Sequence, residues 1–196
     1  GTPTVKPGNS VFTKCPNRDC EGRREALLTH FVSRGAMDVD GLGEKLAVML
    51  LEKGLVENAA DLYSLSVAQL AELDGMGELS AQGIIDSLEA SKARPFASVL
   101  FALGIEGVGE VTGRSLAQRL RTIDALLAAD AEEIAQTPGV GPIVGELIAT
   151  QLADEQMRSL IAALRVAGLQ FEQEGPPPGE GHLANKTFVL TGLCRR

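Results

Sequence analysis

The chain has 196 residues, a formal net charge of −8 at pH 7 and 44% hydrophobic residues, enough for one or two small domains with apolar cores. Aromatic residues make up only 4%, with one Tyr and no Trp, which disfavours a single-strand binder that stacks bases on aromatic side chains. The sequence contains no apolar run near twenty residues and no charged-then-apolar leader. It therefore predicts no membrane span, no secretory signal and a soluble, cytoplasmic protein.

Two cysteines lie in the irregular N-terminal stretch. Cys15 and Cys20 are separated by four residues that include a Pro and an Asn, a spacing that suits a zinc-binding knuckle. A structural zinc site has four ligands, and His30, His182 and Cys194 are not placed to complete the set. The cysteines themselves leave two interpretations open, part of a zinc site or two free thiols, and a disulfide is disfavoured in a cytosolic protein.

The hydrophobic pattern predicts a helical chain. Apolar residues at 27, 28, 31 and 32 mark one face of a first helix over 25–32. Further helices are expected over 44–53, 59–73, 78–92, 96–103, 110–121, 124–136, 142–152 and 154–167. Three consecutive prolines between glycines then predict a linker, and Thr187 to Gly192 predicts a buried strand that runs into a turn.

Four Gly-apolar-Gly triplets separate these helices, and their first glycines are 34, 32 and 32 residues apart. The triplets are Gly41-Leu42-Gly43, Gly75-Met76-Gly77, Gly107-Val108-Gly109 and Gly139-Val140-Gly141. A small residue follows each second glycine by four positions: Ala47, Ala81, Gly113 and Gly145. The repeat predicts a unit of helix, tight hairpin and helix, in which the central apolar residue points inward and the small residue allows a close helix crossing. Replacing Gly77 or Gly109 by Val is expected to cost about 1–3 kcal/mol if that glycine holds positive φ.

Such hairpins expose a concave row of backbone N–H groups at a helix start, which favours an anion. Repeated along a chain, this geometry suits the phosphate backbone of duplex nucleic acid. The expected DNA-binding residues are the eight hairpin glycines with two neighbouring cations: Gly41, Gly43, Lys45, Gly75, Gly77, Gly107, Gly109, Arg114, Gly139 and Gly141. The alternatives are that glycine pairs only end helices, or that some hairpins serve structure or protein interaction.

The charge distribution limits how such binding could work. Residues 54–172 carry 7 basic against 17 acidic side chains, so binding would depend on local N–H groups and a few cations. About 3–5 neutralised phosphates are expected, giving a log–log salt slope of about −3 to −4.5 with no preference for base sequence. Further candidate cations are Arg23, Arg24, Arg34, Lys92, Arg94, Arg119 and Arg121.

The run from His30 to Gly43 resembles the segment that follows the zinc finger in bacterial NAD-dependent DNA ligases. Asp61-Leu62-Tyr63, Ser91-Lys92 and Leu103-Gly104-Ile105 with Val108-Gly109 also match that family. The resemblance implies a mainly α fold, a tandem array of four helix-hairpin-helix motifs, preceded by half of a four-cysteine zinc finger and followed by the first strand of a BRCT domain. Cys15 and Cys20 match the second cysteine pair of that finger. The implied boundaries are 1–24 for the incomplete zinc finger, 25–172 for the helix-hairpin-helix domain, 173–183 for the linker and 184–196 for the beginning of the BRCT domain.

A Lys-x-Asp-Gly signature, which carries the adenylated lysine in that family, occurs nowhere in these 196 residues. The resemblance therefore implies the DNA-clamping part of a ligase, without a catalytic residue and inactive in nick sealing by itself. NAD and Mg would belong to the parent protein only, and zinc would bind weakly to two cysteines. The implied partner is nicked double-stranded DNA, bound in replication and repair by a cytoplasmic, nucleoid-associated monomer. Three alternatives stay open: a DNA-binding array of another repair protein, a helix-hairpin-helix DNA glycosylase with a catalytic Asp or Lys, and a protein-interaction scaffold.

Overall fold

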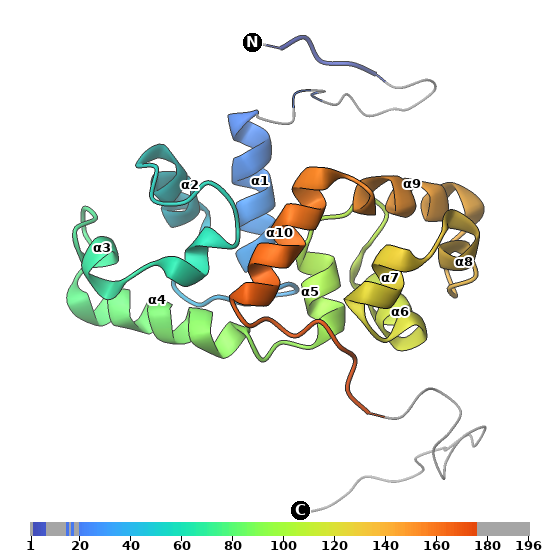
Figure 1. The fold of residues 1–196 in the computed structure, drawn as a ribbon. Helices are drawn as coiled ribbons and strands as arrows, with labels where there is room; N and C mark the ends of the chain where they lie inside the picture. Colours follow the sequence, from blue (N-terminus) through green and yellow to red (C-terminus); the bar gives the residue numbers. More distant parts are fainter. Residues whose placement is uncertain (1, 7–14, 16, 18–19, 176–196) are drawn as a thin grey trace, which may run out of the picture.

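A computed structural model describes residues 2–6, 15, 17 and 20–175 (Figure 1). Within these residues the chain forms ten α-helices and one 3₁₀-helix, and it has no strand beyond an isolated bridge between Thr122 and Glu172. The mainly α fold is thus confirmed for this part of the chain. The three consecutive prolines and the strand expected over 187–192 lie outside the described residues.

The helices fall into two groups along the chain (Figure 1). The first group is α1 (Glu21–Val32), α2 (Glu44–Glu52), η1 (Asp61–Ser64), α3 (Val67–Ala71) and α4 (Glu78–Ser91). The second is α5 (Phe96–Ala102), α6 (Glu110–Leu120), α7 (Ile123–Ala128), α8 (Ala131–Ala135) and α9 (Pro142–Leu152). The last helix, α10 (Glu155–Val166), lies between the two groups in the view of Figure 1. None of the described helices is long and apolar enough to cross a membrane.

Three of the expected helices differ from the structure by more than one residue at an end. The first helix begins at Glu21, so it extends into the segment predicted as zinc finger. The helix expected over 59–73 is broken before α3, because the Ser66 side chain accepts the N–H of Gln69 in a capping box. The helix expected over 124–136 is broken in the same way before α8, where the Asp130 side chain accepts the N–H of Glu133.

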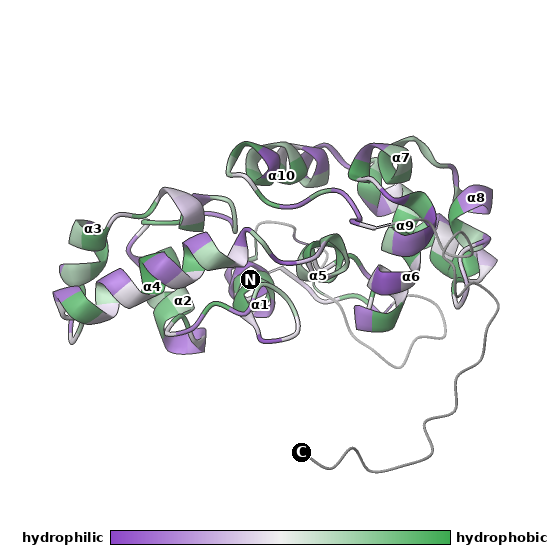
Figure 2. Cartoon of the chain, turned by 90° about the horizontal axis from the view of Figure 1, so that it is seen from below, coloured by the Kyte–Doolittle hydropathy of each residue, from purple (hydrophilic) through white to green (hydrophobic). Residues whose placement is uncertain are grey.

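One continuous apolar core joins the two groups. Helix α5 lies near the centre of the molecule and is apolar on nearly all sides (Figure 2). Helix α1 contacts both η1 of its own group and α5 of the second group through two adjacent aromatic residues. The Phe31 ring lies edge-on to Tyr63, with centroids 6.3 Å apart, and the His30 ring lies edge-on to Phe101 at 4.5 Å. The core therefore fixes the positions of the two groups relative to each other.

Candidate nucleic-acid interface

The four glycine triplets form four turns of the same geometry, here called turns 1 to 4 in chain order. The first glycine of each turn has positive φ: 80° at Gly41, 78° at Gly75, 93° at Gly107 and 85° at Gly139. The second glycine is the N-cap of the following helix and has extended backbone, with φ of −85°, −95°, −86° and −90° at Gly43, Gly77, Gly109 and Gly141. The predicted cost of replacing Gly77 or Gly109 by Val required positive φ at that glycine, and this condition is not met. Only the first glycine of each turn needs the left-handed region.

A backbone hydrogen bond closes each turn. The N–H of the central apolar residue donates to the carbonyl three residues earlier, at 3.0 Å for Met76, 2.9 Å for Val108 and Val140, and 3.4 Å for Leu42. The side chains of Leu42, Val108 and Val140 are buried, as expected for the inward-pointing residue. The Met76 side chain is only partly buried, because it packs at the edge of the core.

The small residue of each repeat is buried at a helix crossing. Its N–H donates to the carbonyl of the second glycine at 2.8–3.0 Å in all four units. A Cβ added to Gly145 would lie 2.6 Å from the Ala131 carbonyl oxygen, and one added to Gly113 would lie 3.0 Å from that of Ala97. The helices before and after turns 3 and 4 thus approach too closely for a larger residue, which confirms the predicted role.

The turns also pack in pairs. A Cβ on Gly41 would meet the Ile84 side chain of α4 at 3.0 Å, and a Cβ on Gly107 would meet the Val144 side chain of α9 at 2.9 Å. Turn 1 therefore packs against the helix that follows turn 2, and turn 3 against the helix that follows turn 4. The array consists of two such double units.

The helices that follow the turns begin without a side-chain cap, as α1 and α5 also do. Among the described helices, α2, α4, α6 and α9 each start at a turn glycine without a side-chain cap. In contrast, the side chains of Ser66, Thr122, Asp130 and Asp154 accept first-turn N–H groups of α3, α7, α8 and α10. All eight turn glycines are exposed. The first-turn N–H groups of the four turn helices are therefore open to an acceptor from outside, and the helix dipole favours an anionic one.

Two of the predicted cations remain exposed beside these helix starts. Lys45 is the second residue of α2, and Arg114 is the fifth residue of α6. Three more of the candidates are exposed elsewhere: Arg23, Arg24 and Arg34.

Four of the predicted cations have structural partners instead. The guanidinium groups of Arg94, Arg119 and Arg121 donate to backbone carbonyls, and Lys92 pairs with a carboxylate. The contacts are Arg94 Nε to Ala36 O at 3.1 Å, Arg119 Nη1 to Glu133 O at 2.6 Å, Arg121 Nη2 to Gln173 O at 2.8 Å and Lys92 Nζ to Glu89 Oε2 at 2.5 Å. The three arginines join separate segments of the fold, and Lys92 pairs locally at the end of α4, so none of the four is a first choice for phosphate contact.

The second helical residue after each turn is a feature that the sequence analysis missed. This position is Lys45 in turn 1 and Leu79, Val111 and Ile143 in turns 2, 3 and 4. The three apolar side chains are among the six large hydrophobic side chains exposed in the described residues. Aligning the four repeats would have placed them at one position, but only the structure shows that they face solvent.

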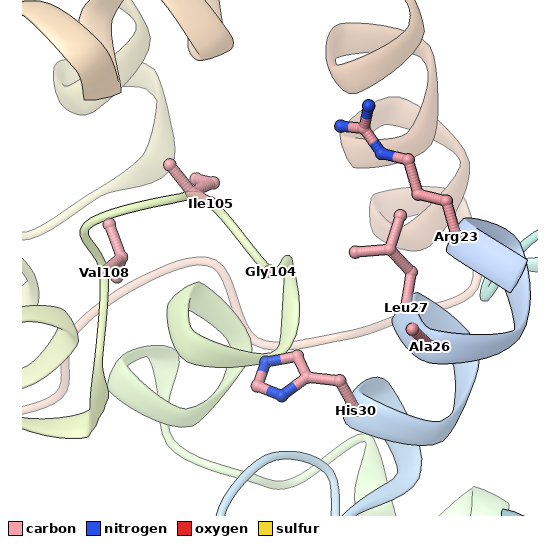
Figure 3. Close-up of a pocket in the computed structure, with 7 residues that line it drawn as sticks. All are labelled: Arg23, Ala26, Leu27, His30, Gly104, Ile105 and Val108. Carbon is pink, nitrogen blue, oxygen red and sulfur yellow. The ribbon is translucent and has the colours of Figure 1, made fainter. Parts of the chain in front are cut away.

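A cavity of about 320 Å³ lies beside turn 3 (Figure 3). Its walls come from α1 and from the segment that leads into the turn: Arg23, Ala26, Leu27, His30, Gly104, Ile105 and Val108. His30 Nε2 lies 2.7 Å from the carbonyl oxygen of Phe101, so the ring is held by the backbone. This lining contains no Asp or Lys.

Cys15 and Cys20 lie at the start of α1, where Cys20 is the N-cap. The N–H of Arg23 and a hydrogen bond with the Cys15 side chain lower the pKa of Cys20, which favours the thiolate that binds metal. Within the described residues no group of three or more His, Cys, Asp or Glu side chains could hold a metal ion.

Comparisons with known proteins agree with this architecture. A family model described as a SAM-like helix-hairpin-helix tandem matches residues 34–90, and one described as a helix-hairpin-helix motif matches residues 98–161. These ranges contain turns 1 and 2 and turns 3 and 4, respectively. The chain is therefore a helix-hairpin-helix protein.

Curated relatives identify the family more closely. The chain is 46% identical over 192 residues to DNA ligase 2 of Deinococcus deserti, covering 98% of this chain and 28% of that protein. It is 44% identical to a DNA ligase of Alkalilimnicola ehrlichii (88% and 26% covered) and 41% identical to one of Rubrobacter xylanophilus (100% and 29%). The chain belongs to the family of bacterial DNA ligases and spans less than a third of the length of these relatives.

Proposed function

We propose that this chain is the DNA-binding, non-catalytic part of an NAD-dependent DNA ligase that seals nicks in duplex DNA. The observation that carries the proposal is the set of four glycine turns whose following helices begin without a side-chain cap. All four turns would act as helix-hairpin-helix motifs, each holding one phosphate of the DNA backbone. The parent protein would act in replication and repair.

The chemistry of the turns explains how an acidic chain could bind a polyanion. Backbone N–H groups donate hydrogen bonds to phosphate oxygens without carrying a net charge, and the dipole of the following helix adds a partial positive charge. Glycine at the first and third positions of each turn leaves no Cβ in the path of a phosphate. At Gly75, Gly77, Gly139 and Gly141 a Cβ would project into open space, with nothing of the protein within 4 Å. Because these contacts involve no bases, they are independent of sequence.

The four turns are not equal as donors. Helix α9 starts with Pro142, which has no N–H, whereas α2, α4 and α6 start with Glu at that position. Turn 4 therefore offers one donor fewer than the others. Lys45 and Arg114 would add the cationic contacts at turns 1 and 3.

The remaining assignments follow from the family. No adenylation lysine motif is present in these residues, so adenylation by NAD, with its Mg requirement, would take place elsewhere in the parent protein. Cys15 and Cys20 would contribute to a zinc site with two further ligands. We propose that the parent works as a monomer in the cytoplasm, at the nucleoid. A protein-interaction scaffold is the second candidate, because residues 54–172 carry 10 more acidic than basic side chains.

The test is a fluorescence anisotropy titration of the chain with nicked duplexes of two unrelated sequences at several salt concentrations. We expect binding at low salt, a log–log slope of about −3 to −4.5 and equal affinity for the two sequences. An intact duplex of the same sequence measures any preference for the nick. Absence of binding at low salt would favour the scaffold, and a covalent AMP adduct on this chain would contradict the non-catalytic assignment.

A further inference from the structure

Three large apolar side chains stand in solvent at one repeated position. Leu79, Val111 and Ile143 are 89%, 74% and 83% exposed, and each is the second helical residue after its turn. Leaving such side chains in water forgoes the stabilisation that burial would give. The other exposed large hydrophobics of the described chain are Val5, Leu27 and Val166, which do not share a repeat position. The exposure of these three side chains is therefore a feature of the turns and not of the surface in general.

The position lies within the proposed phosphate contact. The N–H of the second helical residue is one of the first-turn donors left without a side-chain cap, so a side chain at this residue starts beside the acceptor that its own backbone would bind. On a DNA strand the groups next to a phosphate are deoxyribose rings, whose carbon atoms are apolar. An apolar side chain here can therefore lose water against a sugar when the N–H groups bind the phosphate.

Charge supports DNA backbone as the occupant. In turn 1 the same position carries Lys45, whose ammonium group can pair directly with a phosphate. Turns 1, 2 and 3 all have a Glu immediately before this position, namely Glu44, Glu78 and Glu110, and each carboxylate repels a phosphate. A contact that does not depend on charge would offset this repulsion at the turns where no cation occupies the position.

We propose that Leu79, Val111 and Ile143 are DNA-contact residues that pack against the deoxyribose rings flanking the phosphates bound by turns 2, 3 and 4. The inference rests on the proposed function and assigns side chains to it. These residues supply a component of binding that does not change with salt, whereas Lys45 supplies one that does.

The experiment compares Leu79→Ala, Val111→Ala and Ile143→Ala with the parent chain in the same titration with nicked duplex. Losing part of one apolar contact should weaken binding by about 3- to 10-fold each, with an unchanged salt slope. Lys45→Ala should instead make the slope shallower by about one. Val166→Ala is the matched control, because Val166 is 90% exposed at the end of α10, away from the turns, and its replacement should leave affinity unchanged.

A second pair of variants tests whether the side chain at position 79 lies beside a bound phosphate, independently of its apolar contact. Leu79→Lys should steepen the slope by about one, since the new cation would lie beside a bound phosphate, and Val166→Lys should not. If the parent binds DNA but the three alanine variants bind equally well, the inference is wrong and the proposed function stands. The inference is also wrong if Val166 variants change binding as the turn variants do. If the parent does not bind DNA, both the inference and the proposed function fail.

Discussion

The backbone N–H of Glu106 donates a 2.9 Å hydrogen bond to Oε1 of Gln151, across 45 residues of sequence. The Gln151 side chain also donates through Nε2 to the Glu106 carbonyl at 3.2 Å, so one amide contacts both polar groups of the same residue. Glu106 directly precedes Gly107, and Gln151 lies near the end of α9. This contact therefore holds turn 3 against the helix that follows turn 4.

Turn 1 is held in the same way. The N–H of Asp40, directly before Gly41, donates to Ser87 Oγ of α4 at 2.8 Å. Ser87 and Gln151 both lie ten residues after the second glycine of the partner turn. The two double units thus repeat a tertiary contact as well as a turn, which supports a duplicated double hairpin as the building block of the array.

Gln151→Ala should destabilise the fold by about 1–2 kcal/mol, because it removes a side chain that bonds both polar groups of the Glu106 backbone. Urea unfolding monitored by circular dichroism measures the change. Replacing Gln118 by Ala provides the control, since Gln118 is exposed on α6. Equal stability of the two variants would show that this contact does not contribute to holding the turn.

Gly75→Ala should cost about 1–2 kcal/mol of stability, because Gly75 has a φ of 78° that an L-residue adopts only with strain. Gly77→Ala is a closely matched comparison and should cost well under 1 kcal/mol, since its φ of −95° is ordinary extended backbone. A Cβ would meet nothing within 4 Å at either position, so the difference in stability between the two variants reports backbone strain alone. Thermal unfolding of both variants tests this, and a reversed order would contradict the assigned conformations.

Gly145→Ala should destabilise the protein by about 2–4 kcal/mol, because the new Cβ would lie 2.6 Å from the backbone oxygen of Ala131, which cannot move without shifting α8. Gly83 is also helical, but a Cβ there has open space, so Gly83→Ala should stabilise by about 0.5–1 kcal/mol. The two substitutions are chemically identical and should have opposite signs in the same denaturation experiment. A stable Gly145→Ala protein would mean that the helices cross less closely than described.

Arg114→Ala should make the salt slope of DNA binding shallower by about one, as an exposed cation beside turn 3 should. Arg119→Ala should leave the slope unchanged, because that guanidinium donates to Glu133 O and Gln136 Oε1. It should instead lower stability by about 1 kcal/mol. Salt-dependent titrations of both variants distinguish the two roles, and equal slopes would contradict a phosphate-binding role for Arg114 and a structural role for Arg119.

The single tyrosine predicts a loss of stability in alkali. Burial of Tyr63 raises its pKa from the ordinary 10.0 to about 12, although the hydrogen bond with Ser91 acts in the opposite direction. The folded state therefore holds its proton while the unfolded chain ionises, so this contribution is complete below pH 10 and roughly 2 kcal/mol is lost as the pH rises to 12.

Tyr63→Phe is the comparison for this effect, since it keeps the ring but cannot ionise. The variant should lose the Ser91 contact, at about 1 kcal/mol, yet its stability should fall less between pH 10 and 12 than that of the parent. Because Tyr63 is the only tyrosine, the ultraviolet absorbance of tyrosinate reports its titration alone. A parent protein that titrates at 10.0 while folded would contradict the described burial.

The turns were predictable from sequence, because glycine at a fixed spacing with an apolar residue between is a strong local signal. The difference between the two glycines of a triplet was not, since both positions carry the same residue and only backbone dihedrals distinguish them. The capping residues Ser66 and Asp130 mark the breaks in two of the expected helices. The apolar periodicity continues through both positions, however, and predicts a single long helix in each case.

The roles of the cations could not be predicted from composition. Arg119 finds its backbone partner at Glu133, 14 residues away, and Arg94 finds Ala36 across 58 residues. Such pairings depend on the packing of the whole array, and local sequence carries no signal for them. Lys45 and Arg114 lie next to a turn in the sequence, and both side chains are exposed in the structure.

At the uncapped helix starts, a side chain that stabilises the fold by capping would also block the proposed phosphate contact. An Asp in place of Gly77 suits the φ of −95° and would cap α4 with its own carboxylate, adding a few tenths of a kcal/mol to the isolated protein. The same carboxylate would occupy the donors proposed for phosphate and repel it. A search for thermostable variants of this chain would therefore tend to select Asp or Ser at these glycines and lose DNA affinity in doing so.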